Sequence, residues 1–269
     1  MGKIAAVQMN SSADVDENLN KAEGFIREAA QQGAEVVVLP EMFAMMGKHE
    51  SDKLTIKETL GDGPIQTWLS KTAGMNNIWV IAGTIPISSN DPNRAFASCL
   101  VYDTYGSQVS HYNKLHLFDV DIRAASENYR ESETTLAGWD IIDIESPVGQ
   151  MGFAVCYDVR FPELFRLLIR RNVDLFVLPS AFTEATGRAH WHSLLRCRAI
   201  ENLSYMVAAC QVGKHANGRR TYGHSMIVDP WGDILAELPE EEGIIVADID
   251  LARVKQLRRE FPVLEGLGG

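Results

Sequence analysis

Residues 34–43 of this chain read AEVVVLPEMF, and residues 173–182 repeat the pattern as VDLFVLPSAF. Each stretch is a short apolar run that ends in Leu-Pro. Each also follows a segment, residues 17–32 or 162–171, whose apolar residues have helical spacing. Strands that are apolar along their whole length are buried on both faces, as in the sheets of α/β proteins. The repeat therefore predicts an α/β chain made of two similar halves.

Two further pairs of segments recur at matching positions in the two halves. Residues 76–82 (NNIWVIA) resemble residues 202–208 (NLSYMVA), and residues 100–106 (LVYDTYG) resemble residues 226–232 (MIVDPWG). The Asp-x-aromatic-Gly of the last pair is typical of a turn between antiparallel strands. Any two α/β segments share apolar strands after helices, but these shared turn residues argue against coincidence.

The order predicted for each half is strand, helix, strand, helix, strand, strand. Helices must cover one face of each sheet, which leaves the other two faces to pack together. We therefore expect a four-layer α-β-β-α sandwich with internal pseudo-two-fold symmetry. No Gly/Ser-rich or Pro-rich linker divides the chain, so residues 1–269 are expected to form a single domain.

Composition narrows the classes of partner. The formal net charge of −11 argues against nucleic acid and anionic membranes, because both need a basic face. No apolar run has membrane-spanning length, and the apolar residues from position 3 onward predict a strand rather than a signal peptide. The four cysteines lack zinc-site or Cys-x-x-Cys spacing. We expect a cytoplasmic protein with reduced thiols.

Cys156 lies in residues 152–163, GFAVCYDVRFPE, between an apolar strand and a helix that Pro162 begins. Hydrolases present nucleophiles on sharp strand-to-helix bends of this kind. The backbone N–H of the next residue, Tyr157, is then placed to bind an oxyanion. This pattern indicates a cysteine nucleophile that attacks a carbonyl carbon.

Such a nucleophile needs a base and a cation. Glu41 directly follows an apolar strand, at the edge where α/β sheets place their sites, although a solvated turn glutamate would fit as well. Lys114 is isolated among apolar and aromatic residues in residues 111–119, HYNKLHLFD. It could be a buried cation that needs a counter-charge, or a lysine that extends from an edge strand into solvent.

A second carboxylate would hold that cation in place. Glu131 lies in residues 129–132, YRES, which read as a loop. Glu127 and Glu133 are close enough in sequence that the residues alone do not choose among the three.

Other residues near these segments could have either a functional or a structural role. Arg160 follows Cys156 by four residues and could bind a substrate carboxylate, or form a structural ion pair. Phe182, Thr183 and His190 are expected in loops beside the site. His190 and His192 could pair on a metal in a strand but diverge in a helix, and the following residues predict a helix, so no metal is expected.

Histidines also allow a cysteine–histidine dyad, with His116 or His224 as the partner of the thiol. Neither lies in a recognisable local signature, so the acid–lysine–thiol set remains the favoured reading.

Three ordered blocks, LPEMF at residues 39–43, NKLHLFD at 113–119 and VCYDVRFPEL at 155–164, resemble the signature blocks of the nitrilase superfamily, the carbon–nitrogen hydrolases. The resemblance covers nearly the whole chain. It implies the α-β-β-α sandwich, a homodimer that extends it, and no cofactor. It also implies Glu41 as general base, Lys114 as oxyanion stabiliser, Cys156 as nucleophile and Glu131 as the second glutamate.

Residues 187–191, 194–201 and 222–232 are similar to the deaminated glutathione amidases, and the omega-amidases that act on 2-oxoglutaramate are the neighbouring branch. Residues 124–128 match neither branch. The resemblance thus implies an amidase with a small amide substrate, such as deaminated glutathione. N-carbamoyl compounds and nitriles are alternative substrates.

A different class of function is also open. The sandwich could be retained as a dimerising metabolite-binding module without catalysis. Apolar residues near the C-terminus, Phe261 and Leu264, favour a dimer in either case.

Overall fold

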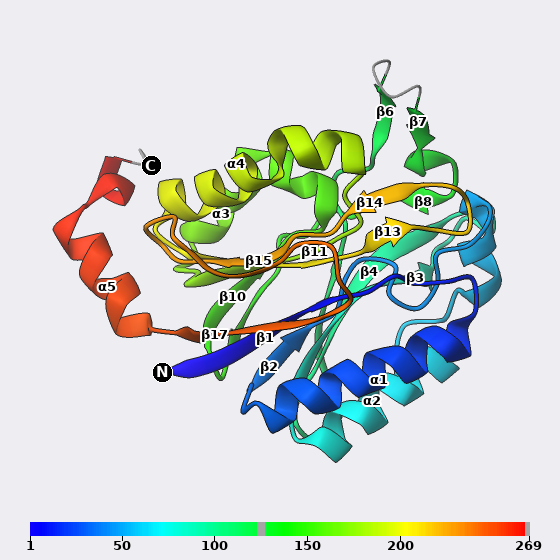
Figure 1. Cartoon of the computed structure of the whole chain (residues 1–269), viewed down its shortest axis with the longest axis horizontal. Coiled ribbons are helices and arrows are strands. Elements are labelled where there is room, and N and C mark those ends of the chain that lie inside the picture. The colour runs from blue at the N-terminus through cyan, green and yellow to red at the C-terminus, as the bar shows by residue number, and fades with distance from the viewer. Residues whose placement is uncertain (123–126, 267–269) are drawn as a thin grey trace.

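The two repeated apolar stretches form central strands of two separate sheets in the computed structural model, which describes residues 1–122 and 127–266 (Figure 1). Residues 124–126 of the unmatched segment 124–128 therefore lie outside the described residues. β2 (Val36–Val38) pairs in parallel with a strand on each side, and so does β11 (Leu175–Ser180). Both are fully buried, as continuous apolar runs predict.

The first sheet is mixed, and its strands are, in order, β17 (Gly243–Ile249), β1 (Gly2–Gln8), β2, β3 (Trp79–Ser88), β4 (Ala95–Tyr102) and β5 (Gln108–Asn113), with β8 (Thr135–Leu136) beside β4. The second sheet is also mixed, and its strands are, in order, β16 (Ile234–Leu238), β15 (Ser225–Val228), β12 (Tyr205–Cys210), β11, β10 (Gly149–Phe153) and β9 (Asp143–Ser146). In each sheet three parallel strands are followed by two antiparallel ones.

Two short hairpins stand apart from these sheets. They are β6 (Asp119–Ile122) with β7 (Glu127–Arg130), and β13 (Val212–Lys214) with β14 (Arg220–Tyr222).

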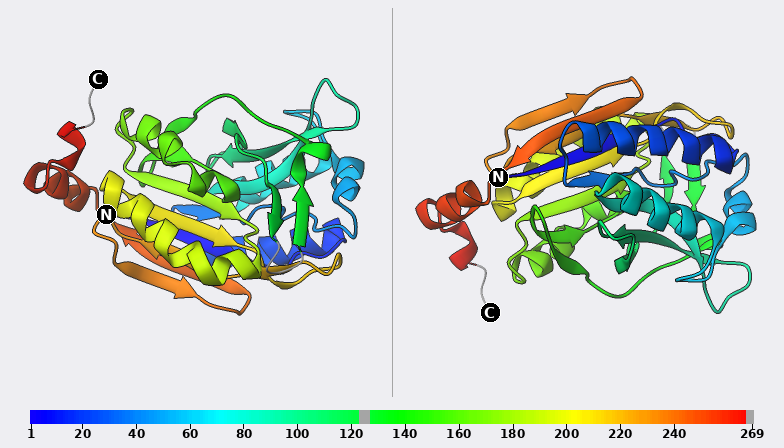
Figure 2. Two further views of the ribbon diagram at one scale, coloured as in Figure 1. Left: turned by 90° about the horizontal axis from the view of Figure 1, so that it is seen from above. Right: turned by 90° about the horizontal axis from the view of Figure 1, so that it is seen from below.

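Helices cover the outer face of each sheet. α1 (Val15–Gln31) and α2 (Pro64–Asn76) lie across the first sheet, while α3 (Pro162–Ile169) and α4 (Glu184–Asn202) lie across the second (Figure 2). α5 (Leu251–Glu260) projects from the end of the molecule where the N-terminus lies (Figure 1). Shorter 3₁₀ helices span Glu50–Ile56, Glu131–Glu133, Cys156–Arg160 and Val263–Gly266.

The helix bounds follow local signals in the sequence. Asp14 caps α1 by accepting from the N–H of Glu17, and Gly33 takes a positive φ of 80° just after the helix ends. Pro162 begins α3, as the sequence predicts.

Alternate residues of β2 reach two apolar cores. Val36 and Val38 face the second sheet and join a core that continues under α3 and α4. Val37 faces the other way and joins a core beneath α1 and α2. Within the described residues, no helix has both the length and the apolar character that crossing a membrane requires.

Gly83 lets β3 approach the chain that carries Glu41. A Cβ at Gly83 would lie 1.8 Å from the carbonyl oxygen of Pro40. The β3–β4 register shifts between Ala82 and Ile85, and the Oγ1 of Thr84 accepts from the N–H of Met42 at 3.0 Å. The bulge thus fixes the backbone on both sides of Glu41.

We expect Gly83→Ala to lower the free energy of unfolding by about 1–3 kcal/mol, because backbone must move to admit the methyl group. Gly24→Ala is the matched control. Gly24 lies in α1 with no atom near its Cβ position, so alanine there should stabilise by about 0.5–1 kcal/mol. Urea denaturation measures both. Equal stability of Gly83→Ala and the parent would show that β3 does not need this close contact.

Candidate active site

The ends of the two repeated strands meet inside the molecule. Glu41 follows β2 and is buried, and its echo in the second half lies at the end of β11. The N–H of Ala181, the residue after β11, donates to Oε2 of Glu41 at 2.8 Å. Gln211 Nε2 donates to the Glu41 backbone carbonyl at 3.0 Å. The second half therefore orients the carboxylate that the first half supplies.

Lys114 follows β5 and is a buried cation with two carboxylate partners. Its Nζ lies 2.9 Å from Oε1 of Glu41 and 2.8 Å from Oε2 of Glu131. Glu131 Oε2 also accepts from the N–H of Phe118 at 2.7 Å. Of the three glutamates that the sequence left open, Glu131 is the one that contacts Lys114. Glu127 instead accepts from the hydroxyl of Tyr129 at 3.2 Å.

Cys156 stands at a strained bend between β10 and α3. Its φ is 47°, in the left-handed region that residues with a side chain rarely adopt, and the 3₁₀ helix Cys156–Arg160 follows. The sulfur lines a pocket that is also lined by Glu41, Lys114 and Glu131. Four side chains far apart in the sequence therefore share one chamber.

Asp158 ties the bend to the Lys114 segment, a role that sequence reasoning missed. Its fully buried carboxylate accepts from the N–H of Val155 at 2.8 Å and from the hydroxyl of Tyr112 at 2.7 Å. It also accepts from the N–H of His116 at 2.9 Å, and lies 2.7 Å from its ring Nδ1. The sequence shows only an acid two residues after Cys156; that this acid is buried and therefore needs several donors is apparent only in the fold.

The pKa values of the buried groups depend on one another. Burial alone would raise the pKa of Glu41, but the charge and hydrogen bond of Lys114 outweigh it, and the net shift is downward. Burial would likewise lower the pKa of Lys114, but Glu131 and Glu41 raise it well above its ordinary value. Lys114 and Glu41 are therefore both charged at neutral pH.

The Cys156 thiol shifts in the opposite sense to Glu41. Burial raises its pKa, the charge of Glu41 raises it further, and Lys114 and Arg219 act against this rise. This shift favours the protonated thiol, so an attack by the sulfur on a carbonyl would require a base to take the proton.

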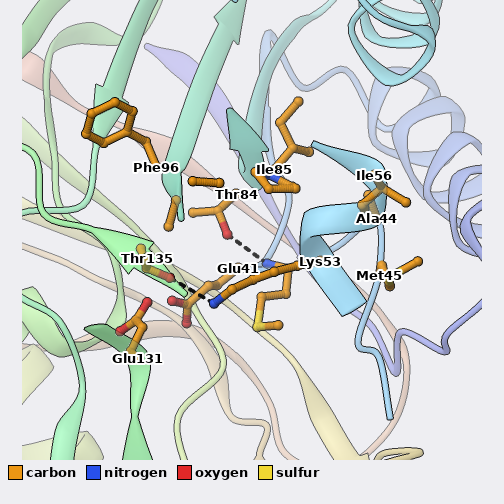
Figure 3. Close-up of a pocket in the computed structure, with 14 residues that line it drawn as sticks. Glu41, Ala44, Met45, Lys53, Ile56, Thr84, Ile85, Phe96, Glu131 and Thr135 are labelled. Atoms are coloured by element: carbon orange, nitrogen blue, oxygen red, sulfur yellow. Dashed lines mark hydrogen bonds between the residues drawn. The ribbon is translucent and has the colours of Figure 1, made fainter. Parts of the chain in front are cut away.

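Two compartments adjoin the carboxylate of Glu41. The chamber that Cys156 lines has a volume of about 30 Å³. An apolar compartment lined by Met45, Ile56, Ile85 and Phe96 lies beside it and shares Glu41 and Glu131 (Figure 3). Lys53 closes it near Glu131 by donating to Thr135 Oγ1 at 2.8 Å (Figure 3). Apolar walls limit water around the Glu41–Lys114 ion pair.

Arg219 also lines the Cys156 chamber and was not singled out from the sequence. It lies between β13 and β14, directly after Gly218, whose positive φ of 83° marks the turn. One arginine in a turn of a distant hairpin carries no local signal, so only the fold brings it to the site.

The other site residues predicted from the sequence are not among the described residues that line this chamber. They are Arg160, Tyr157, Phe182, Thr183 and His190. Arg160 Nη1 lies 3.3 Å from Nδ1 of His190, and its guanidinium carbon is 5.1 Å from the ring centroid of Phe182. Thr183 caps α4 by accepting from the N–H of Thr186. The N–H of Tyr157 belongs to the first turn of a 3₁₀ helix, where N–H groups lack partners within the helix.

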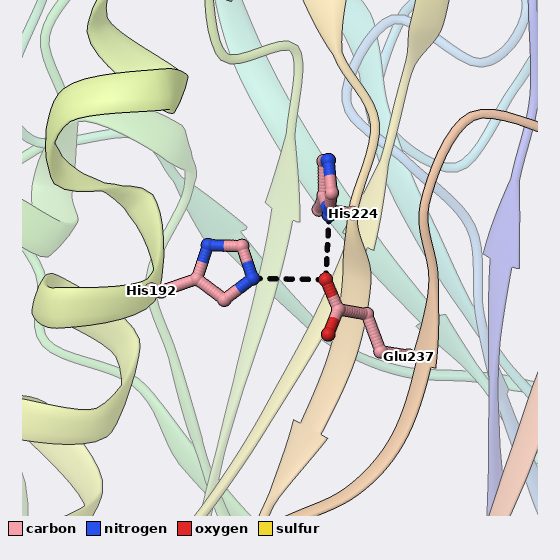
Figure 4. A group of neighbouring side chains, drawn as sticks. All are labelled: His192, His224 and Glu237. Atoms are coloured by element: carbon pink, nitrogen blue, oxygen red, sulfur yellow. Dashed lines mark hydrogen bonds and ion pairs between the residues drawn. The ribbon is translucent and has the colours of Figure 1, made fainter.

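Two histidines and a glutamate form a separate cluster, apart from the chamber. His192, on α4, and His224 both contact Oε1 of Glu237, at 2.9 Å and 2.5 Å (Figure 4). Their donor atoms lie within 4.8 Å of one another, a set that could hold a divalent ion. The shared hydrogen bonds explain the cluster without one. His190 and His192 both lie on α4, where residues two apart point in different directions, so they do not form the metal pair considered from the sequence.

The chemistry available in the chamber is covalent. A thiol lies beside a charged carboxylate that can take its proton, and a fixed ammonium can stabilise negative charge that forms on a carbonyl oxygen. A second carboxylate keeps the ammonium charged and in place.

A sequence model of the carbon-nitrogen hydrolase family matches residues 3–259. A Synechocystis sp. (strain PCC 6803 / GT-S) protein named deaminated glutathione amidase is 39% identical over 264 residues, covering 97% of this chain and 96% of that protein. The crystal structure of the C. elegans NitFhit protein matches with a TM-score of 0.92 at 38% identity, covering 98% of this chain and 64% of that one.

Saccharomyces cerevisiae Nit3, described as a member of branch 10 of the nitrilase superfamily, matches with a TM-score of 0.87 at 31% identity. That match covers 97% of this chain and 94% of Nit3. Sequence and structure thus agree over nearly the full length.

We expect Glu41→Gln to shift alkylation of Cys156 to lower pH, because it removes a charge that raises the thiol pKa while Lys114 remains to lower it. A shift of one unit would make labelling at neutral pH about tenfold faster. The measurement is the rate of iodoacetamide labelling against pH, read by mass spectrometry of the Cys156 peptide.

Exposed Cys197 in the same samples is the internal control, since its labelling should not change. An unchanged pH profile at Cys156 would mean that the Glu41 carboxylate lies too far from the sulfur to act as its base.

Proposed function

Because the chain belongs to the carbon–nitrogen hydrolase family, we propose that it is a cysteine-dependent amidase that cleaves the C–N bond of a small, carboxylate-bearing amide. The observation that carries this proposal is the contact of Lys114 with both Glu41 and Glu131 in the chamber that Cys156 lines. A structural ion pair would not need a thiol on a strained bend beside it.

In the proposed first half-reaction, the Cys156 sulfur bonds to the amide carbonyl carbon while its proton passes to Glu41. Lys114 and the N–H of Tyr157 hold the oxyanion of the tetrahedral intermediate. The C–N bond then breaks, and Glu41 returns the proton to the departing nitrogen. This leaves a thioester on Cys156 and a neutral amine or ammonia.

In the second half-reaction, Glu41 takes a proton from water as the water oxygen bonds to the thioester carbon. The C–S bond breaks, the carboxylic acid product forms, and the sulfur regains a proton from Glu41. Neither half-reaction consumes an oxidant or reductant, and the residues named supply every proton transfer.

The opposed pKa shifts of Glu41 and Cys156 fit this order of events. In the resting site the proton stays on sulfur, because Lys114 favours a charged Glu41. An oxyanion that forms beside Lys114 offsets the ammonium charge, which raises the proton affinity of Glu41. Proton transfer is therefore favourable only when a carbonyl is being attacked, and the idle thiol is protected from side reactions.

We propose deaminated glutathione as the substrate. The proposal is supported by the Synechocystis relative of that name, which is 39% identical along nearly its whole length. 2-Oxoglutaramate, N-carbamoyl compounds and nitriles offer the same carbonyl or nitrile carbon to the thiol and are the alternatives.

We also propose that residues 1–269 act as a single domain, a four-layer α-β-β-α sandwich with pseudo-two-fold symmetry. The matching strand orders of the two sheets support this, and so does a site to which both halves contribute. The four cysteines are free thiols, which supports the cytoplasm as the compartment.

We expect the purified protein to hydrolyse deaminated glutathione faster than 2-oxoglutaramate, an N-carbamoyl amino acid or a simple nitrile, by kcat/KM. Cys156→Ala should abolish turnover of each substrate, because no thioester can form. Mass spectrometry of rapidly quenched enzyme should find an acyl adduct on the Cys156 peptide.

Residual turnover by Cys156→Ala would exclude the covalent route. Preference for another member of the panel would keep the mechanism and replace the substrate.

We propose a homodimer, supported by apolar side chains left exposed near the C-terminus. Phe261 is half-exposed and packs edge-on against Trp231, with ring centroids 5.8 Å apart. Light scattering should give twice the chain mass, and Trp231→Glu should reduce it to that of one chain. A monomeric mass for the parent protein would contradict this proposal.

A further inference from the structure

Arg219 differs from the other cations of the chamber in having no carboxylate partner. The other cationic side chains that line the chamber lie within 4 Å of a described carboxylate: Lys53 of Glu50, Lys114 of Glu41 and Glu131, and Arg130 of Asp121. No described carboxylate lies that close to Arg219. The chamber thus holds one guanidinium that forms no ion pair within 4 Å among the described residues, although the more distant charges of Glu41 and Glu50 stabilise it.

The contacts of Arg219 hold its guanidinium in place but leave one of its N–H donors without a hydrogen bond to a described residue. Its Nη2 donates to the backbone carbonyl of Ala181, and its guanidinium carbon lies 5.1 Å from the ring centroid of Tyr129. Its Nε is sealed from solvent and has no hydrogen-bond partner among the described residues. Because Nε is sealed, a ligand in the chamber must approach the guanidinium through its Nη atoms.

The position of Arg219 is at a boundary. It lines the 30 Å³ chamber of Cys156 and also a wider, open cavity of about 550 Å³. The charged residues that line this cavity with Arg219 are Lys48, Arg130, Glu50, Glu127 and Glu133. A ligand that enters from the open cavity with its amide directed at Cys156 must pass the guanidinium.

We propose that Arg219 binds the free carboxylate of the amide substrate and so selects carboxylate-bearing amides over neutral ones. This inference rests on the amidase function proposed above. It assigns to Arg219 the recognition that the sequence suggested for Arg160, which contacts His190 and the Phe182 ring instead.

A carboxylate suits this place on chemical grounds. A guanidinium presents several N–H donors whose geometry matches the two oxygens of a carboxylate. The chain carries a net charge of −11, which repels anions at a distance. Arg219 adds a cation without a described carboxylate within 4 Å at the place where the substrate must bind.

Arg219 has a second effect that a test must separate, because its charge also lowers the pKa of the Cys156 thiol. Loss of that effect would slow every substrate, charged or neutral. Loss of carboxylate binding would slow only the charged one.

The test compares glutaramate, a five-carbon amide with a free carboxylate, with its methyl ester, which replaces the charge at that end by a methyl group. For Arg219→Gln we expect kcat/KM on glutaramate to fall about 30-fold or more, the loss that follows when one partner of a buried charge pair is removed. The ester should lose only the smaller factor that follows from the thiol pKa, and the additional loss on glutaramate should lie mainly in KM.

Two further variants complete the design. Arg220→Gln is the matched control, since Arg220 is adjacent in sequence but pairs with Glu184 on the surface. It should leave both substrates unchanged. Arg219→Lys keeps the positive charge but lacks the paired N–H donors of the guanidinium, so we expect an intermediate loss of kcat/KM on glutaramate. This variant replaces Arg219→Gln in the test if Arg219→Gln does not fold.

Equal losses on acid and ester, or no loss on either, would overturn the inference. So would loss of the preference for the acid in Arg160→Gln but not in Arg219→Gln.

A binding experiment tests the role of Arg219 independently of whether the protein is an amidase. Glutarate should protect Cys156 from iodoacetamide in the parent protein and should fail to do so in Arg219→Gln. If no amide is hydrolysed at all, the proposed function fails, while this protection still decides the role of Arg219. Equal protection in both proteins would overturn it.

Discussion

The buried ion cluster of Lys114 with Glu41 and Glu131 is the constraint on which the rest of the site depends. An ammonium this deeply buried remains charged only with two carboxylates at 2.9 Å and 2.8 Å. Those carboxylates need fixed donors of their own, which the N–H groups of Ala181 and Phe118 provide. A carboxylate and an ammonium are thereby held rigidly beside the sulfur of Cys156, in a chamber too small for bulk water.

The architecture explains why these groups meet. Two sheets of matching strand order pack face to face, so the loops after β2 and β11 lie at the same edge. One half places an acid at the end of its central strand, and the other places a backbone N–H there. Asp158 then joins the bend at Cys156 to the segment that carries Lys114. The chamber is therefore complete only when the two halves are packed together.

Charge is distributed unevenly across the chamber. Three of its cations are neutralised by carboxylates of the chain, and Arg219 is not. The neutralised set suits proton transfer, because each charge is fixed by a partner. Arg219 lies without a carboxylate within 4 Å among the described residues, which leaves its guanidinium available to a ligand. The chamber thus combines charges fixed in ion pairs with one cation that forms none.

The repeated apolar strands, their covering helices and the three segments that carry Glu41, Lys114 and Cys156 could be predicted from the sequence, because they depend on local periodicity and local turns. The contact of Glu131 with Lys114, the anchoring of the bend by Asp158 and the entry of Arg219 into the chamber became apparent only in the folded chain. These roles depend on contacts between residues distant along the chain. Adjacent residues alone carry no record of such contacts, because burial and charge pairing exist only after the two halves have packed.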